Sequence, residues 1–207
     1  MRRYIDLSDA VLIGTGDHKK VFIDPADTNR CIKVLFRTPD EDMERELAYR
    51  KSREKRRLTS KLLPTYYGMV ETNLGIGYVF ERVSDFDGST SRTVEQLFKS
   101  AAADSRFIPL VEQVMHKFKA MVLEELIVVS NVEPANFAIQ KYSETNFTIR
   151  IIDNIGSSAL IPLVYYFDCV AKYRTKKYWN RFLNELQNNF PAVMTAELKE
   201  KLLIVEE

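Results

Sequence analysis

The chain has 207 residues, of which 45% are hydrophobic and 29% charged, an ordinary composition for a soluble protein with one well-buried core. Lysine and arginine number 30 against 29 aspartates and glutamates, so net charge argues neither for nor against nucleic acid. Two cysteines, Cys31 and Cys169, argue against a disulfide framework and favour a reducing compartment. The start lacks an apolar signal segment and residues 159–167 are too short to span a bilayer, so we expect a cytoplasmic protein without membrane contact.

The first third of the chain has the pattern of short strands. Residues 11–13 and 20–23 are apolar or alternating runs, separated by Gly14 and Gly16, and residues 31–36 form a third apolar run. Glycines at the first connection and the polar residues 24–29 at the second are typical turn formers. These patterns predict an antiparallel meander.

A helix and two further strands are predicted next. Thr38 is a good N-cap, Pro39 suits the first helical position and Glu41 completes a capping box, so we expect a helix running towards Arg57. Two apolar segments beyond it, joined by a hairpin-like connection, indicate the fourth and fifth strands. They cover residues 66–71 and 77–83.

The second half of the chain is mostly helical. Leu110, Val114, Phe118 and Leu126 recur at helical spacing. The other expected elements are a buried strand at 127–129, a hairpin of 137–140 with 147–152, and helices from about Val164 divided by Pro191. We therefore predict an α+β fold with two lobes: a five-stranded lobe (1–83), a linker (84–88) and a shortened helical lobe (89–207).

Four features match the requirements of phosphoryl transfer, which needs held phosphates, bound metal and an aligned nucleophile. The first is the turn of Gly14 and Gly16, which lies between two strands and so suits a loop folded over phosphates. A turn with two glycines is common in any protein, and Lys19 stands where a third glycine of such a loop is expected. This feature alone is weak.

The second feature is Lys33, which lies in the middle of an apolar strand. A buried lysine is costly unless it is paired, and the predicted helix offers carboxylates at Glu44 and Glu46. Glu46 precedes Leu47 and is expected to face the sheet and pair with Lys33. The alternative is an edge-strand lysine that reaches solvent.

The third and fourth features are Asn136 and Asp153, each at the edge of the predicted hairpin. Amide and carboxylate oxygens are suitable ligands for Mg²⁺. Each residue alone is also a common turn former. The occurrence of all four features in this order is more specific than any of them separately.

These residues resemble the protein-kinase-like superfamily and, more closely, the bacterial PhoP regulatory network protein YrbL family. The resemblance implies ATP and Mg²⁺ as cofactors, with Lys33 on the α- and β-phosphates and Glu46 as its partner. It also implies Asn136 and Asp153 on the metal, and a hinge from Glu81 to Val83 that offers backbone groups to adenine. The motifs are 13–20 (IGTGDHKK), 30–33 (RCIK), 45–49 (RELAY), 67–72 (YGMVET), 85–88 (DFDG), 134–136 (PAN), 153–156 (DNIG) and 161–163 (IPL).

The chain departs from the kinase pattern at the catalytic loop. The catalytic-base position is Asn131, whose amide cannot accept a proton as a carboxylate does. The position of the loop lysine is Glu133, which reverses a charge, and Val129 takes the place of the loop histidine. Asp153 is retained, so slow catalysis remains compatible with the sequence.

Three functions follow in order of preference. The first is a regulatory pseudokinase or very weak kinase that binds ATP and Mg²⁺, with a possible protein partner in a regulatory network. The second is an active small-molecule phosphotransferase that uses Asp153, Asn136 and Glu133. The third is a module that binds nucleic acid or an acidic partner through the basic run 50–61 (RKSREKRRLTSK), although such runs usually form a solvated helix face. The ordered kinase-like motifs disfavour nucleic acid.

Overall fold

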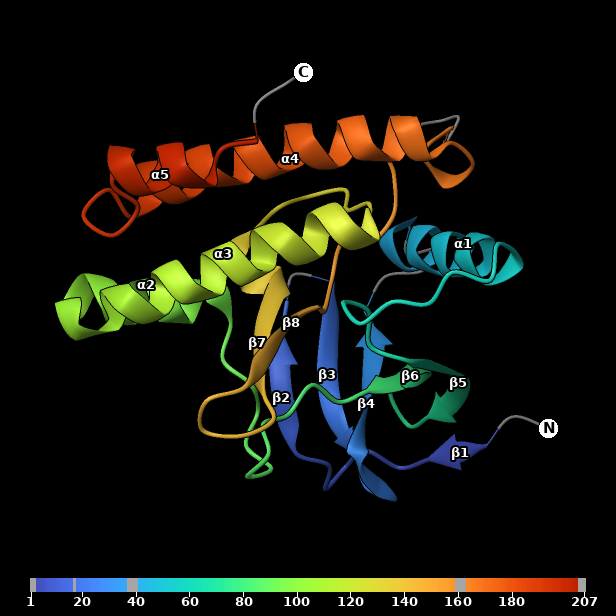
Figure 1. Ribbon diagram of the computed structural model, residues 1–207. Helices are drawn as coiled ribbons and strands as arrows, with labels where there is room; N and C mark the ends of the chain where they lie inside the picture. The colour runs from blue at the N-terminus through green and yellow to red at the C-terminus, as the bar shows by residue number, and fades with distance from the viewer. Residues whose placement is uncertain (1–2, 17, 37–40, 159–162, 205–207) are drawn as a thin grey trace.

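A computed structural model describes residues 3–16, 18–36, 41–158 and 163–204, which form a mixed α+β protein with one six-stranded sheet and five α-helices (Figure 1). The expected cap residues Thr38 and Pro39, together with Asp17 and residues 161–162 of the motifs, lie outside these ranges. Within them, no helix combines the length and apolar composition that a bilayer span requires.

The six-stranded sheet has the order β1-β5-β6-β4-β3-β2. Its strands are β1 (Tyr4–Ile5), β2 (Leu12–Thr15), β3 (Lys19–Asp24), β4 (Asp27–Leu35), β5 (Tyr66–Thr72) and β6 (Gly75–Glu81). All neighbours are antiparallel except β1 and β5, which are parallel. The expectation of five strands is therefore wrong by one. The additional strand β1 has only two residues, too few for an alternating pattern to reveal it.

The helix α1 (Glu41–Lys55) follows β4 and packs beside the sheet (Figure 1). Strand β4 begins at Asp27, inside the segment expected as a turn, because Asp24 and Asp27 already pair across a short connection. Strand β6 ends at Glu81, two residues earlier than expected. The apolar run expected at residues 31–36 corresponds to the end of β4, whose last five residues, 31–35, are all buried.

The rest of the chain forms layered helices around a small hairpin. The elements are α2 (Val94–Ala103), α3 (Ile108–Glu125), β7 (Phe137–Lys141), β8 (Phe147–Ile151), α4 (Asp168–Asn189) and α5 (Ala196–Leu202), with short 3₁₀ turns η1 (Ser105–Phe107), η2 (Pro134–Asn136) and η3 (Leu163–Tyr165). In Figure 1, α4 and α5 form the layer farthest from the six-stranded sheet, and α2 and α3 lie between them and the hairpin.

Two elements of this part differ from the sequence-based expectation. The helix α2 was not predicted, although Thr93 and Gln96 form a complete capping box at its start. The strand expected at 127–129 is reduced to a single bridge between Val129 and Ile155. The apolar run at 127–129 is buried in the core rather than paired in a sheet. A sequence of three apolar residues does not distinguish a buried strand from a buried loop.

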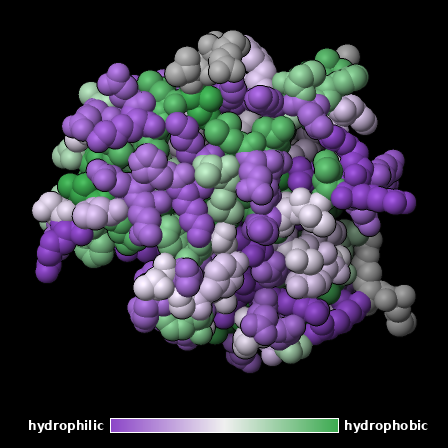
Figure 2. All heavy atoms as spheres, in the orientation of Figure 1, coloured by the Kyte–Doolittle hydropathy of each residue, from purple (hydrophilic) through white to green (hydrophobic). Residues whose placement is uncertain are grey.

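The hydrophobic core consists of separate clusters in the six-stranded sheet and in the helical part. The two faces of the sheet carry separate small clusters, one including Ile32 and Val34 and the other including Cys31 and Phe80. A much larger cluster includes residues of the helices α2, α3, α4 and α5 and of the hairpin, and Phe118, Phe137 and Trp179 are among its aromatic residues. In Figure 2 hydrophilic residues cover most of the visible face, and hydrophobic ones show mainly in its upper half, where the helices lie.

Candidate functional site

A cavity of about 800 Å³ lies where the sheet meets the helical part. It is bounded by the β2–β3 turn, β4, α1, the linker after β6 and the loops before η2 and after β8. Nine of the ten residues predicted for the site line this cavity, and only Glu46 lies behind its wall. The nine are Gly14, Gly16, Lys33, Glu81, Val83, Asn131, Glu133, Asn136 and Asp153.

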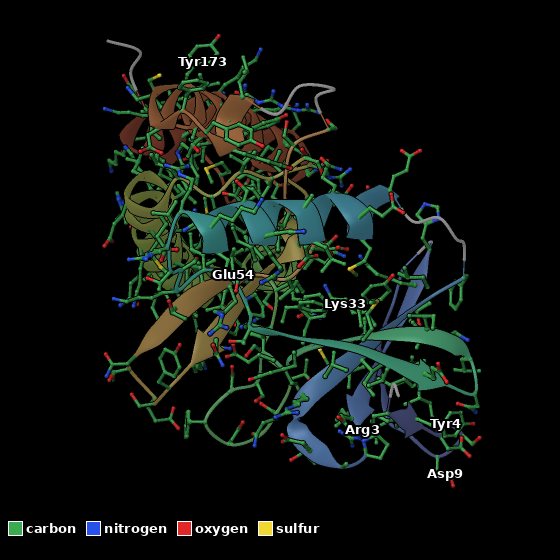
Figure 3. The ribbon with its side chains drawn as sticks, turned by 90° about the vertical axis from the view of Figure 1, so that its right-hand side faces the viewer. Arg3, Tyr4, Asp9, Lys33, Glu54 and Tyr173 are labelled. Carbon is green, nitrogen blue, oxygen red and sulfur yellow. The ribbon has the colours of Figure 1, made fainter. Side chains whose placement is uncertain are left out.

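Lys33 lies on the central strand β4, on the face that points towards α1 (Figure 3). Its side chain is 8% exposed, and Nζ lies 3.9 Å from Oε2 of Glu46. The same amine donates a hydrogen bond of 2.8 Å to the carbonyl oxygen of Ile152, in the loop after β8. The alternative of a solvent-reaching edge lysine is therefore wrong, and the expected pair with Glu46 is present.

Glu46 is a buried carboxylate between two cations. Its residue is 2% exposed, and besides Lys33 it accepts from Arg50, with 2.7 Å between Nη2 and Oε1. Helical periodicity explains this position, because Met43 and Tyr49 share the buried face of α1 while Glu44 is exposed. Arg50 also donates to the carbonyl oxygen of Pro64, so α1 is fixed against the chain that follows it.

Asp153 follows β8 and faces the cavity from the side opposite β3. Lys19, on β3, donates a hydrogen bond to its Oδ1. Burial by itself would raise the pKa of Asp153, but the charges of Lys33 and Lys19 outweigh burial and hold this pKa below its usual range. The residue is therefore a carboxylate at neutral pH.

Asn136 has an unused polar group in the cavity wall. It ends η2, is 8% exposed, and its backbone carbonyl accepts from the amide of Ile152 at 2.9 Å, which keeps it beside Asp153. Its Nδ2 is buried without a hydrogen-bond partner in the described part of the chain. Unpaired buried amides are rare. This Nδ2 can donate to an acceptor atom in the cavity, whereas only the side-chain oxygen of Asn136 could bind a cation.

The donor set fits a magnesium ion that is shared with phosphates. Mg²⁺ is usually held by one or two carboxylates together with substrate phosphate oxygens. Asp153 and Asn136 supply a carboxylate and an amide, and the described residues contain no cluster of three or more His, Cys, Asp or Glu that would complete a site by itself. The residues fit this metal only if a ligand contributes further oxygens.

Asn131 and Glu133 lie together on the loop before η2. The side chain of Asn131 donates to Oε1 of Glu133, and its Oδ1 accepts from the amide of Val132 at 2.8 Å. Glu133 is exposed and lines the cavity, so its carboxylate is accessible from the cavity. Ser130 donates to the carbonyl oxygen of Asn154, which holds this loop against the loop of Asp153.

The other end of the cavity is apolar. Ile13, Val21, Cys31, Phe80 and Val83 line it, a combination that suits a flat apolar ring. The backbone of the expected hinge is only partly available to an adenine. The amide of Arg82 donates to the carbonyl oxygen of Asn29, and the carbonyl oxygen of Val83 accepts from the amide of Ser91. A base bound there would meet mainly the apolar side chains.

Several residues that line the cavity were not predicted as site residues, among them Lys19 and Arg45. Lys19 had been noted only as a departure from a glycine pattern, and Arg45 lines the cavity beside its partner Asp42, with 2.6 Å between Nη2 and Oδ1. Gly156 does not line the cavity but lies against Arg45. Its φ is +100°, and a Cβ there would lie 2.8 Å from Cγ of Arg45. A glycine shortly after Asp153 is the only sequence signal for this close approach.

Three of the four arginines of the basic run 50–61 bond to other groups of the protein, namely Arg50, Arg53 and Arg56. Arg53 donates to the carbonyl oxygen of Thr59 at 2.8 Å, and Arg56 donates to that of Tyr165 at 3.0 Å and to Asp168 at 2.6 Å. These bonds tie the end of α1 to its following loop and to the chain before α4. Much of the basic run is therefore structural.

The fold and the cleft define a mixed α+β protein in which cationic strand residues face an acidic loop residue across one cavity. Residues 5–187 match the model of the family described as PhoP regulatory network protein YrbL, and the chain belongs to this family. It is 32% identical over 199 residues to the "Uncharacterized protein YrbL" of Escherichia coli (strain K12), covering 95% of this chain and 92% of that protein. The protein of the same name from Shigella flexneri matches to the same extent.

Proposed function

We propose that this protein is a cytoplasmic, kinase-like regulatory protein that binds an adenine nucleotide with Mg²⁺ in the cleft between sheet and helices. The observation that carries the proposal is the convergence of Lys33 and Asp153 on one cavity, with Glu46 behind the lysine. In protein kinases a strand lysine paired with a helix glutamate holds the phosphates, and an aspartate and an asparagine hold the metal. Lys33, Glu46, Asp153 and Asn136 are the corresponding groups.

The surroundings of these four residues support the same assignment. The turn of Gly14 and Gly16 borders the cavity above the lysines, and a Cβ at either glycine would meet no atom closer than 3.7 Å. The glycines are therefore not required by packing, which leaves room for a ligand near the backbone. The apolar end at Val21 and Phe80 suits the base, and the polar end suits the phosphates.

Catalysis by this site is weak or absent in the proposal. Asn131, at the position of the catalytic base, is already bonded to Glu133 and cannot take a proton from a substrate hydroxyl. Glu133 would place a negative charge where a kinase places a lysine against transferring phosphate. Nucleotide binding would then serve as a signal, read by a protein partner in a regulatory network.

The decisive experiment is nucleotide titration of the purified protein by calorimetry and thermal unfolding. ATP with Mg²⁺ is expected to raise the unfolding temperature, and Lys33→Ala is expected to remove the effect. Lys20→Ala is the matched control, because Lys20 pairs with Val34 and so lies on the other face of the sheet. If the wild-type protein shows neither heat of binding nor a thermal shift, the proposal is wrong.

A second candidate is an active phosphotransferase acting on a small molecule. The observation in its favour is the exposed carboxylate of Glu133 inside the cavity, which can accept the proton of a bound hydroxyl in place of Asn131. Labelled phosphate transfer that disappears in both Asp153→Ala and Glu133→Gln would support it. Nucleotide binding without turnover would support the regulatory function instead.

The third candidate, binding through the basic run 50–61, is the least supported. Arg50, Arg53 and Arg56 already bond to carbonyl oxygens or carboxylates of this chain. Phosphate binding would require them to leave these partners. Binding that is strongly salt-dependent and unaffected by Lys33→Ala would reinstate it.

A further inference from the structure

Lys19 connects the two sides of the cleft by a single contact. Its side chain, 18% exposed, extends from β3 to Oδ1 of Asp153, whose side chain is 22% exposed. The backbone at Lys19 is fixed, because its carbonyl accepts from the amide of Gly16 at 2.9 Å and the residue pairs with Leu35 of β4. The amine of Lys19 therefore reaches Asp153 from a rigid strand.

The two lysines near Asp153 have different tasks. The charge of Lys33 also acts on Asp153, but its amine donates to the carbonyl oxygen of Ile152 and pairs with Glu46, and no hydrogen bond from it to Asp153 is found among the described residues. Lys19 is the cation that is hydrogen-bonded to the carboxylate itself. No other hydrogen bond of the Lys19 amine is found among the described residues.

We propose that Lys19 is a built-in cation that occupies Asp153 in place of a divalent metal ion, so that metal binding requires its displacement. This inference deepens the proposed function, since it concerns the metal of the same site. A magnesium ion approaches its oxygen ligands to about 2.0–2.1 Å. An ammonium group on the same carboxylate oxygen would occupy that position and repel the ion.

The competition has a consequence for the order of binding. A metal ion alone has to break the contact between Lys19 and Asp153 with nothing to receive the released amine. A nucleotide supplies phosphate oxygens that accept the amine and also bind the metal. Metal and nucleotide are therefore expected to bind cooperatively, each raising the affinity for the other by the same factor.

The test measures the binding of Mn²⁺ in the absence of nucleotide. Binding is monitored by electron paramagnetic resonance as the loss of the free-ion signal. Lys19→Met is expected to bind Mn²⁺ about tenfold more tightly than the wild-type protein, within the usual range for such coupling. Lys20→Met is the control for the loss of a positive charge from the same strand. The amine of Lys20 lies over the ring of Phe36, 5.4 Å from its centroid, and not at Asp153. Lys19→Arg keeps the cation and is expected to behave as the wild type.

The variant Lys19→Met with Asp153→Asn identifies the site of the gained metal. It is expected to lose the gain, and its far-ultraviolet circular dichroism verifies that it is folded. The inference is overturned if Lys19→Met binds Mn²⁺ no more tightly than the wild type, including the case in which no variant binds. It is also overturned if the gain persists without the carboxylate of Asp153.

A separate titration with ATP distinguishes this inference from the proposed function. A gain in Mn²⁺ affinity in Lys19→Met without any ATP binding would refute the nucleotide proposal and leave the role of Lys19 intact. ATP binding with no change in Mn²⁺ affinity would refute only the role of Lys19.

Discussion

Arg150 on β8 and Glu81 on β6 form an ion pair, with 2.6 Å between Nη2 and Oε2, that joins the hairpin of the helical part to the sheet. Glu81 also accepts from the backbone amide of Thr65 at 2.9 Å, and Arg150 donates to Gln140 at 3.1 Å. The pair lies at the point where the chain leaves the sheet. It fixes the two sides of the cleft relative to each other.

This ion pair predicts a specific loss of stability in acid. Burial would raise the pKa of Glu81, but its bonds from Thr65 and Arg150 outweigh burial and hold the pKa below the ordinary value of 4.5. A lowered pKa in the folded state means that the carboxylate stabilises the fold fully above pH 4.5 and that this contribution is lost as the pH falls through the folded pKa. Glu81→Gln should remove this part of the pH dependence.

The measurement is urea unfolding of the wild type and Glu81→Gln between about pH 3 and pH 7. At neutral pH the variant is expected to lose about 2 kcal/mol, the scale of hydrogen bonds to charged groups. The difference between the two proteins should shrink as the pH falls below 4.5. Glu71→Gln, an exposed position of the same sheet, is the control, and an equal loss at all pH values would contradict the assignment.

The shared carboxylate of Glu46 predicts an asymmetry between two substitutions in one ion pair. Glu46→Gln leaves Lys33 and Arg50 without their carboxylate, at 8% and 15% side-chain exposure. Uncompensated buried charge costs about 3–5 kcal/mol. Lys33→Met leaves Glu46 paired with Arg50 and is expected to cost only about 1 kcal/mol.

Urea unfolding of both variants and of the double variant checks this expectation. Glu44→Gln, exposed on the same helix, should change the free energy of unfolding by less than about 0.5 kcal/mol. In the double variant, Glu46→Gln should lower the free energy of unfolding by less than it does alone, because only one buried cation, Arg50, is left without its carboxylate. Equal costs for the two single substitutions would show that Glu46 does not serve both cations.

The sequence predicted which residues line the cavity better than it predicted the boundaries of the elements. A lysine in an apolar strand must find a partner, and this requirement identified Glu46 on the helix that follows. By contrast β1, with two residues, has no pattern to read, and the apolar run 127–129 is indistinguishable from a strand until its packing is known. The contact of Lys19 with Asp153 could not be predicted, since it depends on how two distant parts are placed.

A glycine substitution tests the close approach of α1 to the loop of Asp153. Gly156 has a φ of +100°, and a Cβ would lie 2.8 Å from Cγ of Arg45 and 2.9 Å from the hydroxyl of Tyr165. Gly88 has a φ of +82° and no atom within 4 Å of the same position. The two glycines therefore share the conformational cost and differ in the clash.

Gly88→Ala is expected to lower the free energy of unfolding by about 1 kcal/mol, the cost of a left-handed backbone with a side chain. Gly156→Ala should cost about 2 kcal/mol more, since overpacking against buried atoms adds to that cost. Thermal and urea unfolding measure both. Equal costs would mean that the loop at Gly156 moves away from α1 without penalty.

The end of α1 offers a comparison between a structural and a solvated cation. Arg56 donates to the carbonyl of Tyr165 and to Asp168, whereas Lys55 is exposed. Arg56→Gln is expected to lower the free energy of unfolding by about 1 kcal/mol, because the carbonyl of Tyr165 keeps only the longer bond from Ser52, at 3.3 Å, and Asp168 loses its cation. Lys55→Gln should change the free energy of unfolding by less than about 0.5 kcal/mol.

Both substitutions remove one positive charge from the basic run 50–61. If this run binds phosphates, both variants should therefore lose affinity for a DNA or RNA oligonucleotide at low salt. A loss of stability confined to Arg56→Gln, with no change in oligonucleotide affinity in either variant, is the result expected if the run holds α1 to the chain before α4.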